Sequence, residues 1–266
     1  EANYLSTKKY KSKVISNEGV ERIIYGESTQ LYINAQTLAV LMKLLGMPEG
    51  NKSRISVSIP RWVKKAPLWI KRLYLAGLFG AELTSPAQRK NEEYGFIEPG
   101  FSQNKIIDLE KANEKFLFEI INLLSEFDVK VNKIYKQKGV INSYGELTSK
   151  LSIRISTKPE NLIKLWSRIG YEYCADRTHK SIIAVAYLKN KLKFLENAKL
   201  FLNEAGLMRE QGISLSKIGV VAEECGFSKA MVTGQLYRNC SSFRVTSAFI
   251  KFKDFVSNYG FGSEFV

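Results

Sequence analysis

The stretch that most constrains the fold runs from residue 68 to residue 85 and reads LWIKRLYLAGLFGAELTS. Its apolar spacing predicts a helix that starts after Pro67. Two neighbouring strips of that helix would carry almost no side chain: Ala76 with Gly80, and Gly77 with Ala81. A second backbone could approach such a surface closely. The helix is expected to end with a single carboxylate, Glu82.

The nonapeptide LAGLFGAEL at residues 75–83 resembles the signature of the LAGLIDADG homing endonucleases. It matches at the first four positions, at Ala81 and, with Glu for Asp, at the acidic eighth position, Glu82. A membrane dimer helix is one alternative for a strip of small residues, but Lys71 and Arg72 interrupt an apolar run that is far shorter than a span of about 20 residues. An ordinary core helix with a solvated terminal glutamate is the other alternative.

The composition predicts a globular chain with a polyanionic partner. The 266 residues are 45% hydrophobic, and 40 Lys and Arg against 26 Asp and Glu give a net charge of +14. This excess favours nucleic acid as the partner. The alternative is a basic amphipathic surface of the protein that binds a membrane. The N-terminal residues lack the apolar region of a secretory signal, so a cytoplasmic location without a membrane partner is expected.

Cysteine and histidine are too sparse for several kinds of site. The cysteines Cys174, Cys225 and Cys240 stand singly, and His179 is the only histidine. No zinc site or disulfide framework can be built from this set, and a His-rich metal hydrolase is excluded. The cysteines are expected to be reduced core residues.

Hydrophobic periodicity and turn residues divide the chain into strands and helices. Short strands are expected at 12–15, 21–25 and 31–33, around a turn at 17–19, and a helix at 36–45. After the central helix come a strand at 94–104, a helix at 107–127, strands at 129–135 and 150–156, and helices at 161–170 and 181–203. This order predicts an α+β fold with a curved antiparallel sheet and helices on one face.

An internal repeat supports a duplicated design. In the first copy, the triplet Tyr25-Gly26-Glu27 is followed by a strand, by a helix that ends at Gly46, and by Lys52. In the second copy, Tyr144-Gly145-Glu146 precedes a strand, a helix that ends at Gly170, and Arg177. The first copy would then be represented only by its second half. A chance likeness between two strand-then-helix stretches is the alternative.

The C-terminal residues differ from the rest of the chain. Ala222, Gly226 and Val232 have the spacing of a helix-turn-helix, with the second helix at 228–237. Lys229, Thr233 and Gln235 on that helix would be DNA contacts. A helical hairpin without DNA contacts is the alternative. A last amphipathic helix at 243–259 should pack back through three aromatic side chains: Phe249, Phe252 and Phe255.

Residues 62–200 resemble one full repeat of a LAGLIDADG endonuclease of the kind found in archaeal inteins, including those in RNA ligase genes. Residues 20–60 resemble the end of the first repeat, and residues 161–173 the repeat-ending helix. The resemblance implies αββαββα repeats whose curved sheets lie along the DNA major groove. It also implies two signature helices that each deliver one acid to a shared Mg²⁺ site. The expected domains are 1–61 and 62–203, the two repeats, and 204–266, the helix-turn-helix region.

The resemblance also implies roles for individual residues. Glu82 would be a catalytic metal ligand, because carboxylates hold the divalent ion that assists phosphodiester hydrolysis. Gln103 matches a polar position that orders water near the metal. Lys52 and Arg177 match the basic position near the scissile phosphate, where a cation stabilises developing charge. Plain contact with the DNA backbone, or a surface ion pair, is the alternative for Gln103 and Arg177. Further DNA contacts are expected from two strand residues, Lys133 and Arg154.

The first acid of this metal site is not expected within the chain. By the spacing of the second repeat, the first signature would lie ahead of residue 1, so an N-terminal half or a second chain must supply it. A truncated first repeat would obstruct a symmetric dimer, which favours the N-terminal half. Glu172 is rejected as the missing acid because Trp166 and Arg168 would prevent close helix packing. No splicing nucleophile stands at residue 1 and no His-Asn ends the sequence, so self-splicing is not expected.

The expected function is therefore a site-specific, Mg²⁺-dependent endonuclease that cleaves double-stranded DNA. The alternative is a non-cleaving, sequence-specific DNA-binding protein derived from the same scaffold. A relative that binds RNA or assists splicing is not excluded by the residues.

Overall fold

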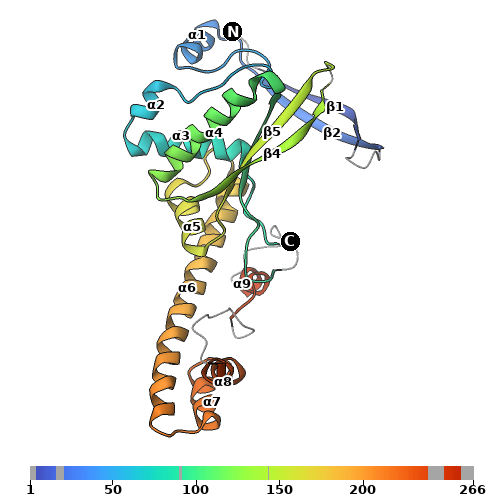
Figure 1. The fold of residues 1–266 in the computed structure, drawn as a ribbon. Helices are drawn as coiled ribbons and strands as arrows, with labels where there is room; N and C mark the ends of the chain where they lie inside the picture. Colours follow the sequence, from blue (N-terminus) through green and yellow to red (C-terminus); the bar gives the residue numbers. More distant parts are fainter. Residues whose placement is uncertain (1–3, 16–20, 90–91, 143, 239–248, 259–266) are drawn as a thin grey trace. The chain divides into compact units, whose positions relative to one another are not determined.

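The computed structural model describes residues 4–15, 21–89, 92–142, 144–238 and 249–258 (Figure 1). They belong to two compact units, residues 1–50 and residues 51–266, and the expected domain boundary at residue 61 stays a prediction. The expected turn at 17–19, Cys240 and the first residues of the expected last helix lie outside the described residues.

The first unit is a β-hairpin followed by one helix. Strands β1 (Tyr4–Ile15) and β2 (Glu21–Tyr32) pair antiparallel over their whole length. The runs predicted as separate strands at 21–25 and 31–33 are one strand, because residues 26–30 also pair with β1. Gly26 lies opposite Tyr10 and leaves room for its ring. Helix α1 (Gln36–Leu44) follows as predicted and ends before Gly46, which has a φ of 94°.

The first unit shows no core among the side chains that the structure describes. Up to residue 50, none of those side chains is buried. Three apolar residues of α1 are at least half exposed: Val40, Leu41 and Leu44, the last at 79%. An amphipathic helix of this kind normally buries its apolar face against another element.

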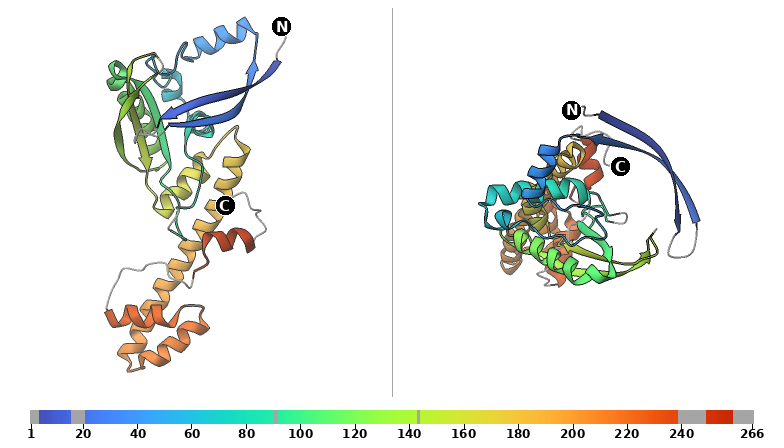
Figure 2. Two further views of the ribbon diagram at one scale, coloured as in Figure 1. Left: turned by 90° about the vertical axis from the view of Figure 1, so that its right-hand side faces the viewer. Right: turned by 90° about the horizontal axis from the view of Figure 1, so that it is seen from above.

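The second unit begins with two helices, a three-stranded sheet and the helices that pack on it. In chain order the elements are α2 (Arg61–Lys65), α3 (Leu68–Glu82), β3 (Gly100–Ile106), α4 (Glu110–Ser125), β4 (Val131–Ile141), β5 (Leu147–Ile155) and α5 (Pro159–Lys164), which continues into a π-helical turn (Leu165–Ile169). The sheet order is β3-β5-β4 and both pairs are antiparallel. Helices α3 and α4 pack on one face of the sheet (Figures 1 and 2).

The sequence predicted the start of α3 after Pro67 and its end at Glu82, and both are confirmed. The stretch between α3 and α4 differs from the αββ pattern, since the described residues there contain one strand and an isolated bridge between Gln88 and Phe96. The strand expected from residue 94 begins only at Gly100. Pro99 lacks the N–H that a continued ladder needs, which accounts for the later start.

Alternation along the strands separates a core face from an outer face of the sheet. Phe101 on β3 stands opposite Ile153 on β5, and both are fully buried beneath the helices. The outer face carries mostly polar residues from all three strands: Ser102, Asn104, Lys133, Tyr135, Gln137, Lys150, Ser152 and Arg154. The sheet is therefore covered on one side, and the other side presents hydrogen-bonding and basic groups.

Helix α6 (Ala175–Glu210) links the main core to a second, smaller core (Figure 1). It is longer than the predicted helix at 181–203 because no stop signal occurs before Gly212, whose φ is 82°. Its last third packs against α7 (Leu215–Glu224) and α8 (Lys229–Arg238). The two helices predicted as a helix-turn-helix are present, with Ala222 and Val232 buried and Gly226 in the turn.

The last helix, α9 (Phe252–Asn258), packs in the main core. Phe249, Phe252 and Phe255 surround the ring of Tyr187, as predicted for packing, although Phe249 precedes the helix. Residues 204–266 are therefore not one packing unit, since α7 and α8 have their own core and α9 completes the core of residues 62–203. None of the described helices is long and apolar enough to cross a membrane.

The repeat is visible as a hairpin followed by a helix. Three residues separate β2 from α1, and three separate β5 from α5, and both helical segments close at a glycine with positive φ, Gly46 and Gly170. The triplets used to align the copies are not equivalent, however. Residues 25–27 lie within β2, whereas residues 144–146 lie at the β4–β5 turn, where Gly145 has a φ of 77°.

Candidate active site at the end of helix α3

Helix α3 delivers one acidic side chain to the surface of the second unit. The chain leaves the helix at Leu83, which is extended, and Thr84 then bonds to Gly100 at the start of β3. Glu82 thus occupies the last helical position, with its side chain about one-third exposed. Its carboxylate is available as an acceptor beside the sheet.

Lys52 reaches this carboxylate from the segment that precedes α2. Its Nζ forms an ion pair and a hydrogen bond with Oε1 of Glu82. The segment is held in place because the main-chain N–H of Ile106, at the end of β3, donates to the carbonyl of Ser53 over 3.0 Å. Two residues expected in one site, 30 positions apart in the sequence, are thereby brought together.

Arg177 approaches the same end of α3 from the first turn of α6. Its Nη1 donates to the carbonyl of Phe79 over 2.9 Å. This carbonyl also accepts the N–H of Leu83 over 3.2 Å, and because the last helical turn carries the negative end of the helix dipole, the guanidinium stabilises it. In this structure Arg177 caps the helix that carries Glu82. Lys52 and Arg177, which follow the two hairpin–helix copies, therefore converge on one helix end.

Gln103 is positioned differently from these three residues. It is only 6% exposed and lies on the core face of β3, between Phe101 and Lys105. Within the described residues, no hydrogen bond joins its side chain to Glu82, and its carbonyl accepts from Asn113 over 3.4 Å. Its expected role in ordering water remains a prediction.

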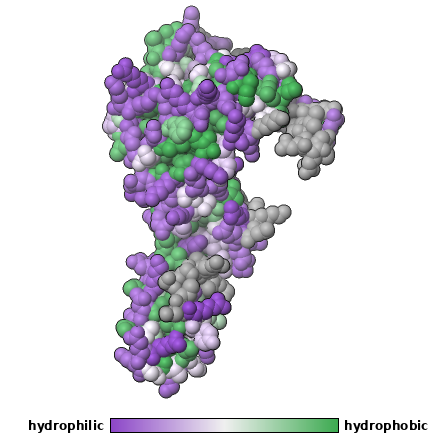
Figure 3. All heavy atoms as spheres, in the orientation of Figure 1, coloured by the Kyte–Doolittle hydropathy of each residue, from purple (hydrophilic) through white to green (hydrophobic). Residues whose placement is uncertain are grey.

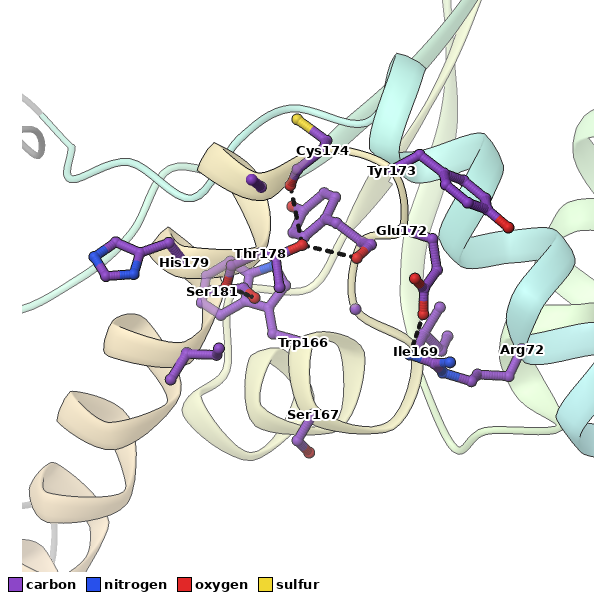
Figure 4. Close-up of a pocket in the computed structure, with 14 residues that line it drawn as sticks. Arg72, Trp166, Ser167, Ile169, Glu172, Tyr173, Cys174, Thr178, His179 and Ser181 are labelled. Carbon is purple, nitrogen blue, oxygen red and sulfur yellow. Dashed lines mark hydrogen bonds and ion pairs between the residues drawn. The ribbon is translucent and has the colours of Figure 1, made fainter.

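The small-residue face of α3 is half covered by the chain itself. Residues 170–173, here named the crossing segment, run over the helix so closely that a Cβ on Gly80 would lie 2.0 Å from the carbonyl oxygen of Glu172. The N–H of Glu172 donates to Ala76 over 2.9 Å, and its carboxylate pairs with Arg72 at 2.8 Å (Figure 4). The expectation that this whole face awaits a second helix is thus wrong for the strip of Ala76 and Gly80.

The second strip, Gly77 with Ala81, stays open. Ala81 is exposed, and a Cβ on Gly77 would meet only the ring edge of Tyr173, at 3.8 Å. Tyr173 is itself 96% exposed and lies beside α3 (Figure 4). One strip of the signature helix is therefore still accessible to another element.

Two positive-φ residues shape the crossing segment, Gly170 at 72° and Tyr173 at 58°. Between them, the hydroxyl of Tyr171 donates to the carbonyl of Thr84 over 2.9 Å. Burial raises the pKa of this hydroxyl above its usual value, so it stays a neutral donor. A pocket lies beside the segment, but its hydroxyl groups donate to main-chain carbonyls, as Thr178 does to that of Tyr171, and Arg72 is paired with Glu172 (Figure 4).

The predicted DNA contacts Lys133 and Arg154 are directly opposite each other on the outer face of the sheet. Lys133 is exposed, with its Nζ 4.5 Å from the centre of the Tyr135 ring, and the guanidinium of Arg154 lies across Gly100. Most of the chain's charge excess is in the same region, since residues 51–203 contain 27 Lys and Arg against 15 Asp and Glu. Hydrophilic residues cover most of the face drawn in Figure 3.

The three predicted contacts on α8 are less uniform. Lys229 is exposed, and its aliphatic chain packs against Gly219 of α7. The hydroxyl of Thr233 donates back to the carbonyl of Lys229 over 2.8 Å, and Gln235 is partly buried. Lys229 is thus the best placed of the three to meet a phosphate.

The described residues do not by themselves form a complete metal site. No group of three or more His, Cys, Asp and Glu residues that could hold a metal ion occurs in the part of the chain that the structure describes. Glu82 can supply one carboxylate, and a Mg²⁺ site usually needs a second one or a substrate phosphate.

Cys174 is partly buried and Cys225 is exposed, so the prediction that the cysteines lie in the core is wrong for these two.

One residue of the site, Lys105, was not predicted from the sequence. It is only 2% exposed, and its Nζ donates to the carbonyls of Lys52, over 2.5 Å, and Ile55, over 3.0 Å. Burial, and then the charge of Lys52, lower its pKa below the usual value. The sequence did indicate this burial, because side-chain alternation along the strand places Lys105 on the same face as the apolar Phe101.

No protein-family model matches the chain, and no solved structure matches it. It is 30% identical over 263 residues to the tRNA-splicing ligase RtcB of Pyrococcus furiosus, an alignment of 99% of this chain and 26% of that protein. It is 32% identical to RtcB of Methanopyrus kandleri, over 72% of this chain and 18% of the relative. It is also 30% identical to the DNA-directed RNA polymerase subunit Rpo1N of Methanocaldococcus jannaschii, over 71% of this chain and 14% of that subunit. The chain spans about a quarter or less of the length of these curated relatives.

Proposed function

We propose that this chain is part of a site-specific endonuclease of the intein homing type, which hydrolyses double-stranded DNA with the help of Mg²⁺. The convergence at one helix end of Glu82, Lys52 and Arg177 carries this proposal. An acid beside two cations suits phosphodiester hydrolysis, in which a carboxylate holds a metal ion and cations offset the charge that develops on phosphate. When bound, the metal would activate water and stabilise the leaving oxygen.

Each of the three residues has a distinct part in the proposal. Glu82 is the metal ligand that this chain contributes. Lys52 neutralises that carboxylate in the protein alone and provides positive charge to the scissile phosphate when DNA is bound. Arg177 holds the last turn of α3, and with it the position of Glu82, through its bond to Phe79.

The proposal requires a partner that supplies the second acid, and we assign this role to an N-terminal half of the same polypeptide. Helix α1 has no buried residue, whereas the corresponding α5 and its π-helical turn bury Leu162 and Leu165 against the main core. Among the described residues of the first unit, no element covers the apolar residues of α1 as the main core covers those of the second copy. The open strip of α3 at Gly77 and Ala81 offers a second surface to the same partner.

The outer face of the sheet is the proposed DNA surface. The major groove of B-DNA admits two-stranded β-ribbons, and side chains such as Arg, Lys, Asn and Gln read base edges there. The eight polar residues named above for this face include no acid and three cations, which are Lys133, Lys150 and Arg154. Lys229 on α8 would add a contact outside the sheet.

The pattern of relatives supports an origin as a mobile insertion. The same kind of segment recurs in proteins with different names, a tRNA-splicing ligase and an RNA polymerase subunit, and it is a small part of each. We infer that a segment shared by proteins with such different names is not tied to either named activity. We therefore do not assign RNA ligation to this chain, and we place it in the cytoplasm with the DNA it would cleave.

Cleavage of a randomised duplex library tests the proposal. The natural polypeptide that contains residues 1–266 is incubated with the library with Mg²⁺ or with a chelator, and the new DNA ends are captured and sequenced. A single family of cut sites that depends on Mg²⁺ supports the proposal. Selective binding of one sequence family without cleavage would support the non-cleaving alternative, and neither binding nor cleavage of DNA would refute both.

A further inference from the structure

Lys105 is a costly residue in an unusual place. It is among the largest fully buried side chains, and it lies on the core face of β3 behind Phe101. Taking an ammonium out of water is unfavourable unless strong hydrogen bonds replace the lost hydration. Both of its partners are carbonyl oxygens, Lys52 at 2.5 Å and Ile55 at 3.0 Å, and neither is a carboxylate.

These two carbonyls belong to a segment without regular secondary structure. Residues 51–60 form no helix or strand and would depend on scattered bonds to stay in place. Lys105 binds the segment at two points, and the next residue of β3, Ile106, binds the carbonyl of Ser53 between them. Three contacts from the end of one strand therefore fix the main chain from which the Lys52 side chain extends.

We propose that Lys105 is a positioning residue that fixes the main chain of residues 52–55 and thereby holds the ammonium of Lys52 at Glu82. The geometry is specific, because the carbonyl of Lys52 itself accepts from Lys105 while its side chain pairs with Glu82. The catalytic meaning of this role rests on the function proposed above. The positioning itself can be measured without DNA.

The reactivity of the Lys52 amine reports its position. The full chain is treated briefly with an acylating reagent, and modification of each lysine is read by mass spectrometry, with exposed Lys115 on α4 as internal reference. The variant Lys105→Met keeps the length of the side chain and removes its donors. It should raise the relative rate at Lys52 several-fold, because the amine is then no longer held against the carboxylate of Glu82 and meets the reagent more often.

A matched control separates positioning from general loss of stability. Ile120→Ala creates a cavity in the core on α4, where Ile120 is fully buried, but it leaves the contacts of Lys105 in place. It should leave the Lys52 rate unchanged despite a lower melting temperature. An equal rise in both variants, or no rise in folded Lys105→Met, would overturn the proposal.

Amide hydrogen exchange at Ile106 provides a second measurement on the unaltered protein. Its N–H bonds to Ser53 and should exchange as slowly as the paired amides of β3, and faster in Lys105→Met. Free exchange at Ile106 in the wild type would refute the fixed segment even if Lys105→Met fails to fold. Because no DNA is present, failure here is distinct from failure of the proposed endonuclease function, which the cleavage test addresses.

Discussion

Two glycines of α3 should respond in opposite directions to the same substitution. At Gly80 an added Cβ would lie 2.0 Å from the carbonyl oxygen of Glu172 and 3.2 Å from its carbonyl carbon, both main-chain atoms. At Gly77 the nearest atom is on the ring of Tyr173, at 3.8 Å, which is ordinary contact. Gly80→Ala and Gly77→Ala therefore make a matched pair on one helix.

The expected magnitudes follow from these contacts. In Gly80→Ala the crossing segment must move by at least about 1 Å to relieve the clash, and such overpacking costs about 1–3 kcal/mol. The movement also weakens the bond from Glu172 to Ala76, worth about 1 kcal/mol. At either position, the higher helix propensity of alanine stabilises the folded state by about 1 kcal/mol relative to glycine. The net is about 2 kcal/mol of destabilisation for Gly80→Ala, and up to about 1 kcal/mol of stabilisation for Gly77→Ala.

Urea unfolding followed by circular dichroism measures both changes, and a thermal scan should show a fall of roughly 4–8 °C for Gly80→Ala in a unit of this size. Equal effects of the two substitutions would refute the reasoning, because they would mean that the crossing segment does not lie against Gly80. A stabilised Gly80→Ala would have the same meaning.

Three further predictions concern binding and stability. Replacing Lys133 and Arg154 together by alanine should reduce the slope of log affinity for duplex DNA against log salt concentration by roughly 0.9 for each phosphate that is no longer neutralised. The control Lys115→Ala should leave the slope unchanged. A wild-type affinity that does not depend on salt would refute the DNA proposal. Lys229→Glu should shorten the hydroxyl-radical footprint on a selected site at one end, with Lys193→Glu on α6 as control, and an unchanged footprint would restrict α7 and α8 to packing. Burial lowers the pKa of Lys191, so the folded state disfavours the charged amine. In denaturant titrations, the free energy of unfolding of the wild type relative to Lys191→Met should therefore rise as pH increases toward 10.5. A fall over that range would contradict the burial of this amine.

Local signals in the sequence were sufficient for helix α3 and for the two helices α7 and α8. These signals act on the nearby backbone, so they predict the helices without knowledge of the fold. They are a proline before the first turn, small residues at four-residue spacing, and a glycine between two apolar helices. The extent of α6 was underestimated because apolar spacing marked only residues 181–203, whereas the helix runs from Ala175 to Glu210.

The contacts that define the candidate site are long-range, and the sequence predicted only some of them. Lys52 and Glu82 were expected in one site through the resemblance, and they form an ion pair. The cap that Arg177 places on Phe79, and the carbonyl of Glu172 over Gly80, depend on how distant segments pack. The triplets at residues 25 and 144 show the limit of local patterns, because the same three letters form a strand in one copy and a turn in the other.

Substitution of Glu82 by glutamine in the natural polypeptide that contains this chain tests the central claim most directly. Glutamine keeps the size of the side chain and removes the charge that a Mg²⁺ ligand needs. On a duplex that the wild type cleaves, Glu82→Gln should abolish Mg²⁺-dependent cleavage while the dissociation constant for DNA stays nearly unchanged. Cleavage at the wild-type rate would remove Glu82 from the site, and parallel loss of cleavage and binding would show that it serves the fold instead.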